Sequence, residues 1–297
     1  MVSIITINYN GWQDTCGLIT SLERFETYPY EVIVVDNASS GDDVKLIKQA
    51  HPKVNVIRSE RNLGFAGGNN KGYQHAKGEY IFFLNNDTLI EAPILEPLVK
   101  RLQSHAIGGV SPMIRYYASS RKVQYYGHQK MTHITLKHAT PPYDELHPEK
   151  YQSAREVEVM HGAAMMLSRR VIEQVGLMSE CYFLYYEEFD WSYHILDKGY
   201  SIWYEPASLV YHKEGTKKGR LLTPFREYYL VRGRVLFARR NLRGVEKVAS
   251  CLYLVGIVMP RFLLLYMLKG RWKSLWAVVT GTFDGLIMKK SDNFKNK

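Results

Sequence analysis

The first 90 residues alternate short β-branched runs with amphipathic segments, and this alternation constrains the fold more than any other feature of the chain. Residues 2–8 and 31–36 have the composition of buried strands, and apolar residues recur at helical spacing between them, over 14–25. A second cycle follows, with helices expected over 42–50 and 70–76 and strands over 54–58 and 80–84. The pattern predicts an α/β fold with a mostly parallel central sheet that is covered on both faces.

The length of 297 residues fits one large α/β core with an appendage, because a single core usually stops growing near 250 to 300 residues. We expect a catalytic domain over 1–220 and a helical region over 221–297. Residues 115–156 show little periodicity and indicate an irregular insertion or flap. We expect an ordered segment again over 157–167. Helices are then expected over 169–175 and 187–198, and a strand over 201–204.

The tail combines apolar runs with basic residues. Residues 250–268 are nearly all apolar, but Pro260 and Arg261 interrupt their centre, which argues against a clean transmembrane helix. A second apolar run covers 275–288. We therefore expect helices that lie in a membrane interface; the alternative is a helical pair packed on the core or in a homo-oligomer.

The net charge and the cysteine content limit which classes of binding partner and which cellular compartment are expected. The formal net charge of +10 suits nucleic acid, anionic lipid or a phosphorylated substrate, and the basic residues concentrate after residue 212, beside the apolar tail. No nucleic-acid-binding module is recognisable, so we expect no nucleic-acid partner. Three widely spaced cysteines support neither a disulfide framework nor a zinc site. No leader is recognisable, which favours a cytoplasmic protein, peripheral on the inner face of the plasma membrane.

Polar residues follow each expected strand of the amino-terminal half. Ligands of such sheets bind beyond the carboxyl ends of the strands, so we expect these loops to converge on one site. The residues concerned are Asn8, Tyr9, Asn10, Asp36, Asn37, Asn85, Asn86 and Asp87.

Two of these segments have more than one interpretation. Asp87, directly after a strand, can hold a divalent cation that bridges two phosphates, or it can form a turn or cap before a helix near Glu91. The glycine-rich segment 61–70 can bring backbone amides to an anionic ligand at the start of a helix, or it can be a structural loop. It matches neither the phosphate-binding P-loop pattern nor a dinucleotide fingerprint.

The acidic cluster Glu187, Glu188 and Asp190 opens the helix expected over 187–198. Acids in a first helical turn can be simple caps. Among aromatic residues, however, mutual repulsion and burial raise at least one carboxyl pKa, as a general base requires. His161 and His212 each end an apolar run; His212 is the stronger candidate for a site because the basic run 213–220 follows it and could close over a diphosphate.

Taken together, these motifs resemble glycosyltransferase family 2, especially its bacterial rhamnosyltransferase-like branch. The resemblance covers about residues 2–215 and rests on segments 5–10, 34–40, 61–70, 84–88, 162–165 and 186–190. It implies the GT-A fold and inverting transfer of a sugar from a nucleotide diphosphate donor, dTDP-rhamnose or a UDP-sugar. The acceptor implied is a polysaccharide or a lipid-linked glycan of the cell surface.

The resemblance also implies roles for individual residues. The donor would be bound by Tyr9, Asp36, Arg61, Asn62, Asn85 and Asn86. A divalent cation, Mn²⁺ or Mg²⁺, would be held by Asp87 of the DxD-like motif and contacted by His212. The catalytic group would be Glu188 as base, with Glu187 and Asp190 positioning the acceptor or supporting the base.

Two departures from the family pattern bear on these roles. Asn85 stands where a full DxD motif has its first aspartate, which leaves one formal acid for the cation. Glu188 replaces the more frequent aspartate. The alternative function is binding of nucleotide sugars or polyanions without catalysis. The acidic cluster argues against this alternative.

Overall fold

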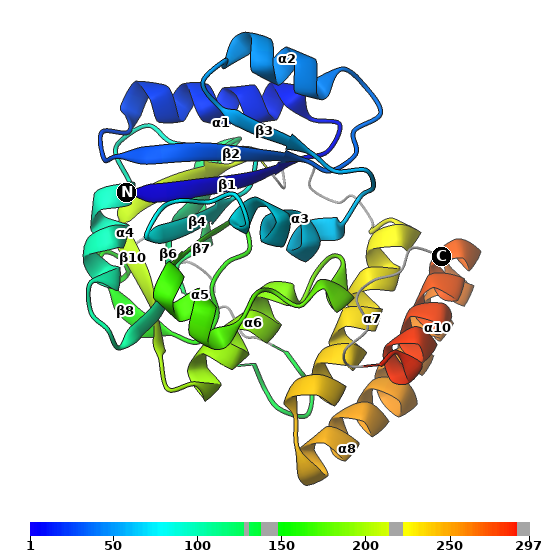
Figure 1. Cartoon of the computed structure of the whole chain (residues 1–297). Coiled ribbons are helices and arrows are strands. Elements are labelled where there is room, and N and C mark those ends of the chain that lie inside the picture. The colour runs from blue at the N-terminus through cyan, green and yellow to red at the C-terminus, as the bar shows by residue number, and fades with distance from the viewer. Residues whose placement is uncertain (128–130, 138–147, 214–221, 290–297) are drawn as a thin grey trace.

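The computed structural model describes residues 1–127, 131–137, 148–213 and 222–289, and within them the strands form one sheet (Figure 1). The path through the sheet is β3-β2-β1-β4-β9-β6-β10-β5, with β7 paired to β6 and β8 to β10. The strands are β1 (Val2–Asn8), β2 (Tyr30–Asp36), β3 (Asn55–Arg58), β4 (Tyr80–Leu84), β5 (Thr88–Leu89), β6 (Ile107–Tyr116), β7 (Ser119–Tyr125), β8 (Arg155–Val157), β9 (Ala164–Ser168) and β10 (Ser201–His212).

The amino-terminal half of the sheet is parallel, and the other half is mixed. β1 pairs in parallel with β2 and β4, and β2 pairs in parallel with β3, as the βαβ pattern predicts. β9 then runs antiparallel to β4 and β6, while β6 and β10 are parallel. The ordered segment expected over 157–167 begins at the last residue of β8, continues through a turn over 158–163 and ends in β9. β10 continues eight residues beyond the expected Tyr204, which brings His212 beside Thr88 of β5.

Helices cover both faces of the sheet. α1 (Trp12–Phe25) and α2 (Asp43–Ala50) lie on one face of β1 to β3, and α3 (Gly64–Tyr73) lies on the other (Figure 1). The remaining helices of the α/β part are α4 (Leu95–Leu102), α5 (Arg169–Val175) and α6 (Glu187–Asp197). The helix expected near Glu91 is α4, which begins at Leu95, and the short strand β5 precedes it, paired at its edge position with β10.

The glycine-rich segment 61–70 differs from its expected form as a loop. Its glycines belong to α3, which begins at Gly64, six residues before the expected start. A Cβ atom on Gly68 would lie 2.8 Å from the Ile7 side chain, and one on Gly72 would lie 2.4 Å from Ile5. The glycines therefore let α3 pack closely on β1, and this packing outweighs their low helix propensity.

The chain ends in a helical layer beside the α/β part (Figure 1). Thr223 caps α7 (Pro224–Asn241) by accepting a hydrogen bond from the Arg226 amide. The layer continues with α8 (Gly244–Tyr253), the π-helical segment Leu254–Val258, α9 (Met259–Leu268) and α10 (Trp272–Ile287). α10 packs along α7, where a Cβ on Gly281 would lie 2.7 Å from the Tyr228 carbonyl oxygen.

The expected interruption at Pro260 does not break the helix. Residues Gly244–Leu268 form a 25-residue helix that is long and apolar enough to cross a membrane, with a mean hydropathy of 2.0 over a window that is 11% buried. Pro260 lies two residues after the end of the π-helical segment. This wider turn accommodates the missing amide donor and the proline ring, which would clash in a regular α-helix.

Candidate active site

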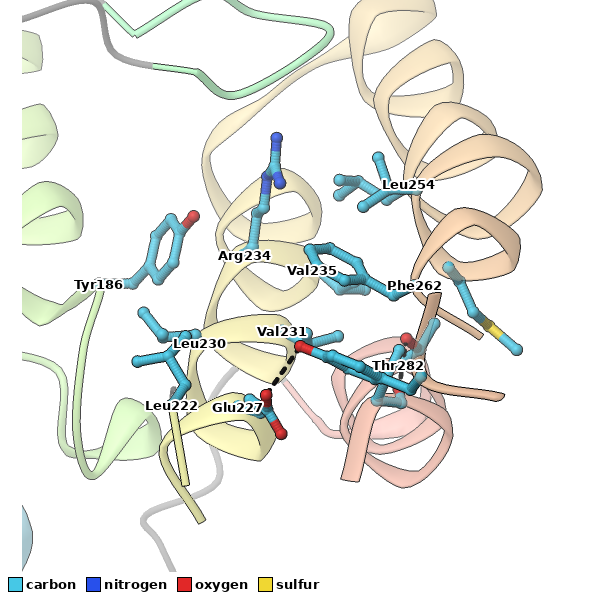
Figure 2. A pocket seen from close by; sticks show the side chains of 14 residues that line it. Tyr186, Leu222, Glu227, Leu230, Val231, Arg234, Val235, Leu254, Phe262 and Thr282 are labelled. Atoms are coloured by element: carbon cyan, nitrogen blue, oxygen red, sulfur yellow. Dashed lines mark hydrogen bonds between the residues drawn. The ribbon is translucent and has the colours of Figure 1, made fainter. Parts of the chain in front are cut away.

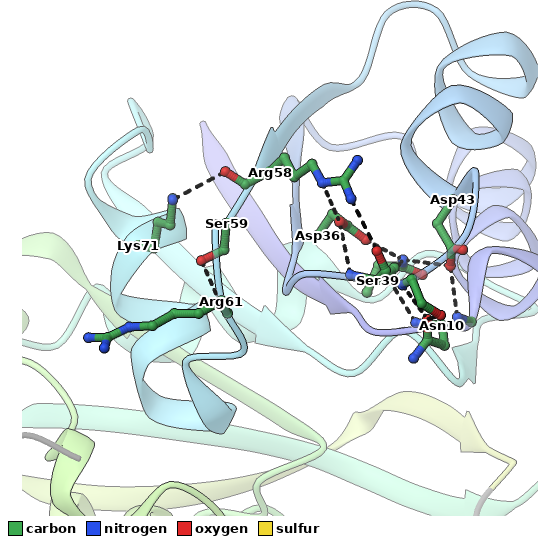
Figure 3. A network of polar contacts seen from close by, with 11 residues as sticks. Asn10, Asp36, Ser39, Asp43, Arg58, Ser59, Arg61 and Lys71 are labelled. Carbon is green, nitrogen blue, oxygen red and sulfur yellow. Dashed lines mark hydrogen bonds and ion pairs between the residues drawn. The ribbon is translucent and has the colours of Figure 1, made fainter. Parts of the chain in front are cut away.

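A polar network fixes the loops at the carboxyl ends of β1 and β2 (Figure 3). The Asn8 amide nitrogen donates to Asp36 Oδ1 and to Asp43 Oδ1, each at 2.9 Å. Asp43 Oδ1 also accepts the backbone amides of Gly11 and Trp12, at 3.0 and 3.2 Å, so it caps the start of α1. Asp36 is fully buried within this network. Its carboxylate therefore holds the loops that would surround a donor.

The remaining donor-site candidates lie around this network. Tyr9 is 52% exposed, and Arg61 is exposed, with its side chain pointing away from the network (Figure 3). Asn62 Oδ1 accepts from the Asn37 amide at 2.9 Å and from the Gly64 backbone amide at 2.9 Å, which shapes the start of α3. The side chains of Tyr9 and Arg61 are thus exposed at the edge of this network, where they can contact a ligand. Asn62 already has hydrogen-bond partners within the protein.

The loop after β4 joins the same edge. The Asn86 amide donates to Thr15 Oγ1 at 3.0 Å, and Thr15 Oγ1 donates to Asn8 Oδ1 at 2.8 Å. The Asn85 backbone amide donates to the Ala163 carbonyl at 2.9 Å. The three loops expected to converge do so, and segment 161–163 joins them.

Asp87 and His212, the two residues predicted to hold a cation, lie side by side. Asp87 Oδ1 is 3.1 Å from His212 Nε2, and His212 Nδ1 is 2.8 Å from Gln124 Oε1. Since the Gln124 oxygen can only accept, His212 Nδ1 carries the hydrogen and Nε2 is the nitrogen that faces Asp87. Gln124, on β7, orients the ring and was not predicted from the sequence.

This pair suits a cation that the substrate helps to hold. Across the described ranges, no group of three or more His, Cys, Asp or Glu side chains is gathered into a metal site. An oxygen from Asp87 and the oriented Nε2 of His212 form a two-ligand set, and Mn²⁺ or Mg²⁺ in sites of this kind completes its coordination with phosphate oxygens and water. The residues therefore fit a divalent cation bound together with a diphosphate.

The acidic cluster follows a strained turn. Phe183, Tyr185 and Tyr186 have φ angles of 64°, 66° and 76°, values that residues with side chains rarely adopt. The turn is held from α3, because the Phe65 amide donates to the Phe183 carbonyl at 2.7 Å, and a Cβ on Gly64 would lie 2.3 Å from the same oxygen. Such strain persists where the surroundings enforce it, and it is concentrated at functional sites.

The two glutamates of the cluster have raised pKa values. Burial raises the pKa of Glu188 to about 7, although nearby backbone amides oppose the shift. Burial, followed by the charge of Glu188, raises the pKa of Glu187 well above its ordinary value. Glu187 is buried, and its Oε2 atom has no hydrogen-bond partner within the described residues. The pair therefore favours a protonated Glu187 beside a Glu188 that titrates near neutrality.

Asp190 is placed differently from the two glutamates. It is fully buried, and its Oδ1 atom accepts from the Tyr182 hydroxyl at 2.8 Å, the Asn241 amide at 2.7 Å and Arg240 Nε at 3.1 Å. This network ties α6 to α7.

Segment 161–163 lies between Glu188 and the pair formed by Asp87 and His212. A Cβ on Gly162 would lie 3.8 Å from the Glu188 carboxyl carbon. The His161 ring centroid is 6.4 Å from that of His212. Lys213 pairs with Asp14 at 2.6 Å, and the rest of the basic run, predicted to close over a diphosphate, falls outside the described residues. Glu188, Asp87 and His212 thus border one region at the end of the sheet.

Comparisons with known proteins agree with this arrangement. The sequence model of the family described as "Glycosyl transferase family 2" matches residues 3–176. A low-salt glycan biosynthesis hexosyltransferase of Haloferax volcanii is 27% identical over 241 residues, which cover 79% of this chain and 74% of that protein. The dTDP-rhamnosyl transferase RfbF of Shigella flexneri is 25% identical over 296 residues, which cover 95% of this chain and 94% of that one.

Solved structures share the fold. A mannosyltransferase of Pyrobaculum calidifontis, in complex with GDP-mannose and Mn²⁺, superposes with a TM-score of 0.61 at 17% identity over 97% of this chain and 87% of that one. A GalNAc transferase with UDP, GalNAc and Mn²⁺ superposes with a TM-score of 0.64 at 18% identity, covering 81% and 50% of the two chains. The fold is GT-A, and the chain belongs to glycosyltransferase family 2 and is a glycosyltransferase of glycan biosynthesis.

Proposed function

We propose that the protein transfers a sugar from a nucleotide diphosphate donor to a hydroxyl of a glycan acceptor, with inversion at the anomeric carbon. The observation that carries this proposal is Glu188, a carboxylate with a pKa raised to about 7 at the end of a strained turn. It borders the same region as Asp87 and His212. A base with a pKa near the working pH is what deprotonation of an acceptor hydroxyl requires.

The donor would lie over the carboxyl ends of β1, β2 and β4. The loops fixed by Asn8 and Asp36 would surround the nucleotide, with Tyr9 and Arg61 contributing from the rim. Asp87 and His212 would hold a divalent cation, Mn²⁺ or Mg²⁺, together with the diphosphate. When bound, the cation supplies positive charge that stabilises the leaving diphosphate.

The transfer is a single displacement. Glu188 takes the proton of the acceptor hydroxyl while the hydroxyl oxygen bonds to the anomeric carbon. The bond between that carbon and the diphosphate oxygen breaks, and the diphosphate leaves with the electron pair. Glu187 keeps its proton and so adds no second negative charge beside the base. Asp190, bonded to Arg240 and Asn241, acts as a positioning residue for α6.

The donor we favour is dTDP-rhamnose, with a UDP-sugar as the second candidate. Support comes from the alignment with the dTDP-rhamnosyl transferase, which extends over 95% of this chain. The Mn²⁺ in the two superposed transferases supports a divalent cation.

We also propose peripheral attachment to the inner face of the plasma membrane through the helical region over 221–297. Helices α8, α9 and α10 and the π-helical segment between α8 and α9 expose many large apolar side chains: Val245, Val248, Leu252, Ile257, Leu264, Leu268, Trp272, Trp276, Phe283 and Ile287. Lys269 and Lys273 are exposed beside the turn between α9 and α10, where anionic lipid headgroups would be attracted. A second copy of the chain is the alternative partner for this face.

The proposal is tested with purified full-length protein and a panel of dTDP- and UDP-sugars, with membrane lipid extract as acceptor. Transfer from one donor that requires added Mn²⁺ or Mg²⁺ is expected. Transfer that is equally fast after chelation would contradict the assignment of Asp87 and His212. An anomeric configuration retained in the product would contradict single displacement.

A further inference from the structure

The helical layer contains a cavity of about 240 Å³ between α7, the 244–268 helix and α10 (Figure 2). Most of its lining is apolar. The lining side chains include Leu230, Val231, Val235, Leu254, Phe262 and Val278. The volume is below the roughly 300 to 1,000 Å³ of pockets that enclose whole drug-sized ligands, so the cavity suits one part of a longer apolar molecule.

The two ends of the cavity differ in charge. Glu227 is buried at one end, where it accepts from the Tyr266 hydroxyl at 2.7 Å and pairs with Arg271 at 3.1 Å. Arg234 extends at the other end (Figure 2). Its guanidinium donates to the Thr135 carbonyl, its Nε atom has no partner in the described parts of the chain, and no carboxylate pairs with it there. The Arg234 end therefore carries a positive charge that is not neutralised.

The other arginines of α7 have structural partners. Arg226 donates to the Tyr185 hydroxyl, and Arg232 donates to the carbonyls of Cys181 and Tyr182. Arg239 donates to the carbonyls of Gly285 and Met288, and Arg240 donates to Asp190. Arg234 is distinguished from them by its place at the cavity. A half-buried cation at the end of an apolar cavity suits a ligand with an anionic group attached to a hydrocarbon chain.

Tyr186 connects this end of the cavity with the base. It lines the cavity and lies two residues before Glu188, at the N-cap of α6. Burial raises the pKa of the Tyr186 phenol most, Arg234 lowers it and Glu188 raises it. Tyr186 therefore joins the cavity wall to the first turn of α6, which carries Glu188.

We infer that the cavity binds the first part of the hydrocarbon chain of a lipid phosphate or diphosphate that carries the acceptor sugar. Arg234 contacts the phosphate, the sugar attached to it reaches Glu188, and the rest of the chain continues along the exposed apolar faces of α9 and α10. The inference rests on the proposed function and selects a lipid-linked acceptor over a free polysaccharide. It also explains why the cavity lies in the layer proposed to contact the membrane.

The test uses full-length protein and farnesyl diphosphate as the probe, with farnesol and inorganic pyrophosphate as its two halves. Binding is measured by calorimetry in the presence of Mn²⁺ and a saturating nucleoside diphosphate, so that the donor site is occupied. Arg234→Gln is expected to weaken farnesyl diphosphate about 10- to 100-fold, as for the loss of a charge-assisted hydrogen bond, and to leave farnesol unchanged. Val231→Phe fills the cavity and is expected to weaken both.

Controls are Arg243→Gln and Leu177→Phe, because the Arg243 side chain is 84% exposed and Leu177, outside the helical layer, is 41% exposed. If Val231→Phe fails to fold, Leu230→Trp tests the same space. Equal binding by wild type and both cavity variants, with the nucleoside diphosphate still bound, would overturn the inference alone. Equal weakening of farnesol and farnesyl diphosphate by Arg234→Gln would overturn the orientation. Absence of nucleoside diphosphate binding would instead contradict the proposed function.

Discussion

Asp87 Oδ1 lies 3.1 Å from His212 Nε2, although the two residues are 125 positions apart in the sequence. The contact arises because the end of β10 pairs with β5, and β5 directly follows Asp87 in the sequence. On its other side β10 pairs with β6, and β6 pairs with β7, which brings His212 to Gln124 of β7. A weak two-ligand set, oriented by a neutral amide, is suited to a cation that arrives with the donor.

Gln124→Ala is expected to weaken Mn²⁺ activation, because His212 loses the acceptor that fixes its ring. Loss of an outer-sphere partner of this kind typically costs 10- to 100-fold in metal affinity. The measurement is the Mn²⁺ concentration that gives half-maximal transfer. Gln49→Ala, at an exposed position on α2, is the control. An unchanged Mn²⁺ requirement in Gln124→Ala would show that His212 does not contact the cation.

Much of the fold was predictable because local patterns determine it. The alternation of strands and helices predicts β1 to β4, α1 and α2, since side-chain periodicity follows directly from burial on one face. The mixed half was not predictable, because β9 inserts between β4 and β6 through contacts distant in sequence. The start of α3 was predicted six residues too late, because glycines in a sequence suggest a loop. Their close packing on Ile5 and Ile7, which explains why they are helical, depends on the tertiary structure.

Individual residues of the candidate site could be predicted from the sequence, but their contacts with one another could not. Asp87 and His212 could be singled out from their positions after apolar runs, and the structure brings the two into contact. Glu187 and Glu188 could be singled out as acids gathered among aromatic residues at the start of a helix. Gln124 could not be found, because it lies in a segment without clear periodicity and its role depends on the position of His212. Burial of Asp36 and Asp190 also depends on tertiary partners that single motifs do not reveal.

Glu187→Gln is expected to stabilise the protein more at pH 8 than at pH 5. The folded-state pKa of Glu187 is raised, so above the ordinary glutamate pKa the folded state binds more protons than the unfolded state. Stability then falls as pH rises, by about 1.4 kcal/mol per pH unit, up to the folded pKa. Thermal unfolding of wild type and variant across this range measures the difference. The exposed control Glu173→Gln should show no such trend.

Asp190→Ala is expected to lower the free energy of unfolding by about 3 to 5 kcal/mol, because it leaves Arg240 without its buried partner. Urea denaturation provides the measurement. Asp197→Ala removes a carboxylate paired with exposed Arg243 at 3.9 Å and should cost at most about 1 kcal/mol. Equal costs for the two variants would argue against a supporting role for Asp190.

Leu264→Glu combined with Trp276→Glu is expected to reduce sedimentation with anionic vesicles at least 10-fold, since both side chains are exposed on the apolar face. Leu177→Glu, at an exposed position before α6, is the control. Wild-type protein that stays in solution with vesicles, and forms dimers that the double variant abolishes, would assign this face to a second copy of the chain.

Glu188→Gln, assayed for both transfer and donor binding, tests the central claim most directly. Wild-type transfer should rise with pH through about 7 as the base loses its proton. The variant should bind the donor as wild type does, yet transfer roughly 10²- to 10⁴-fold more slowly, without this pH dependence. Transfer at the wild-type rate with the same pH profile would contradict the assignment of Glu188 as the base.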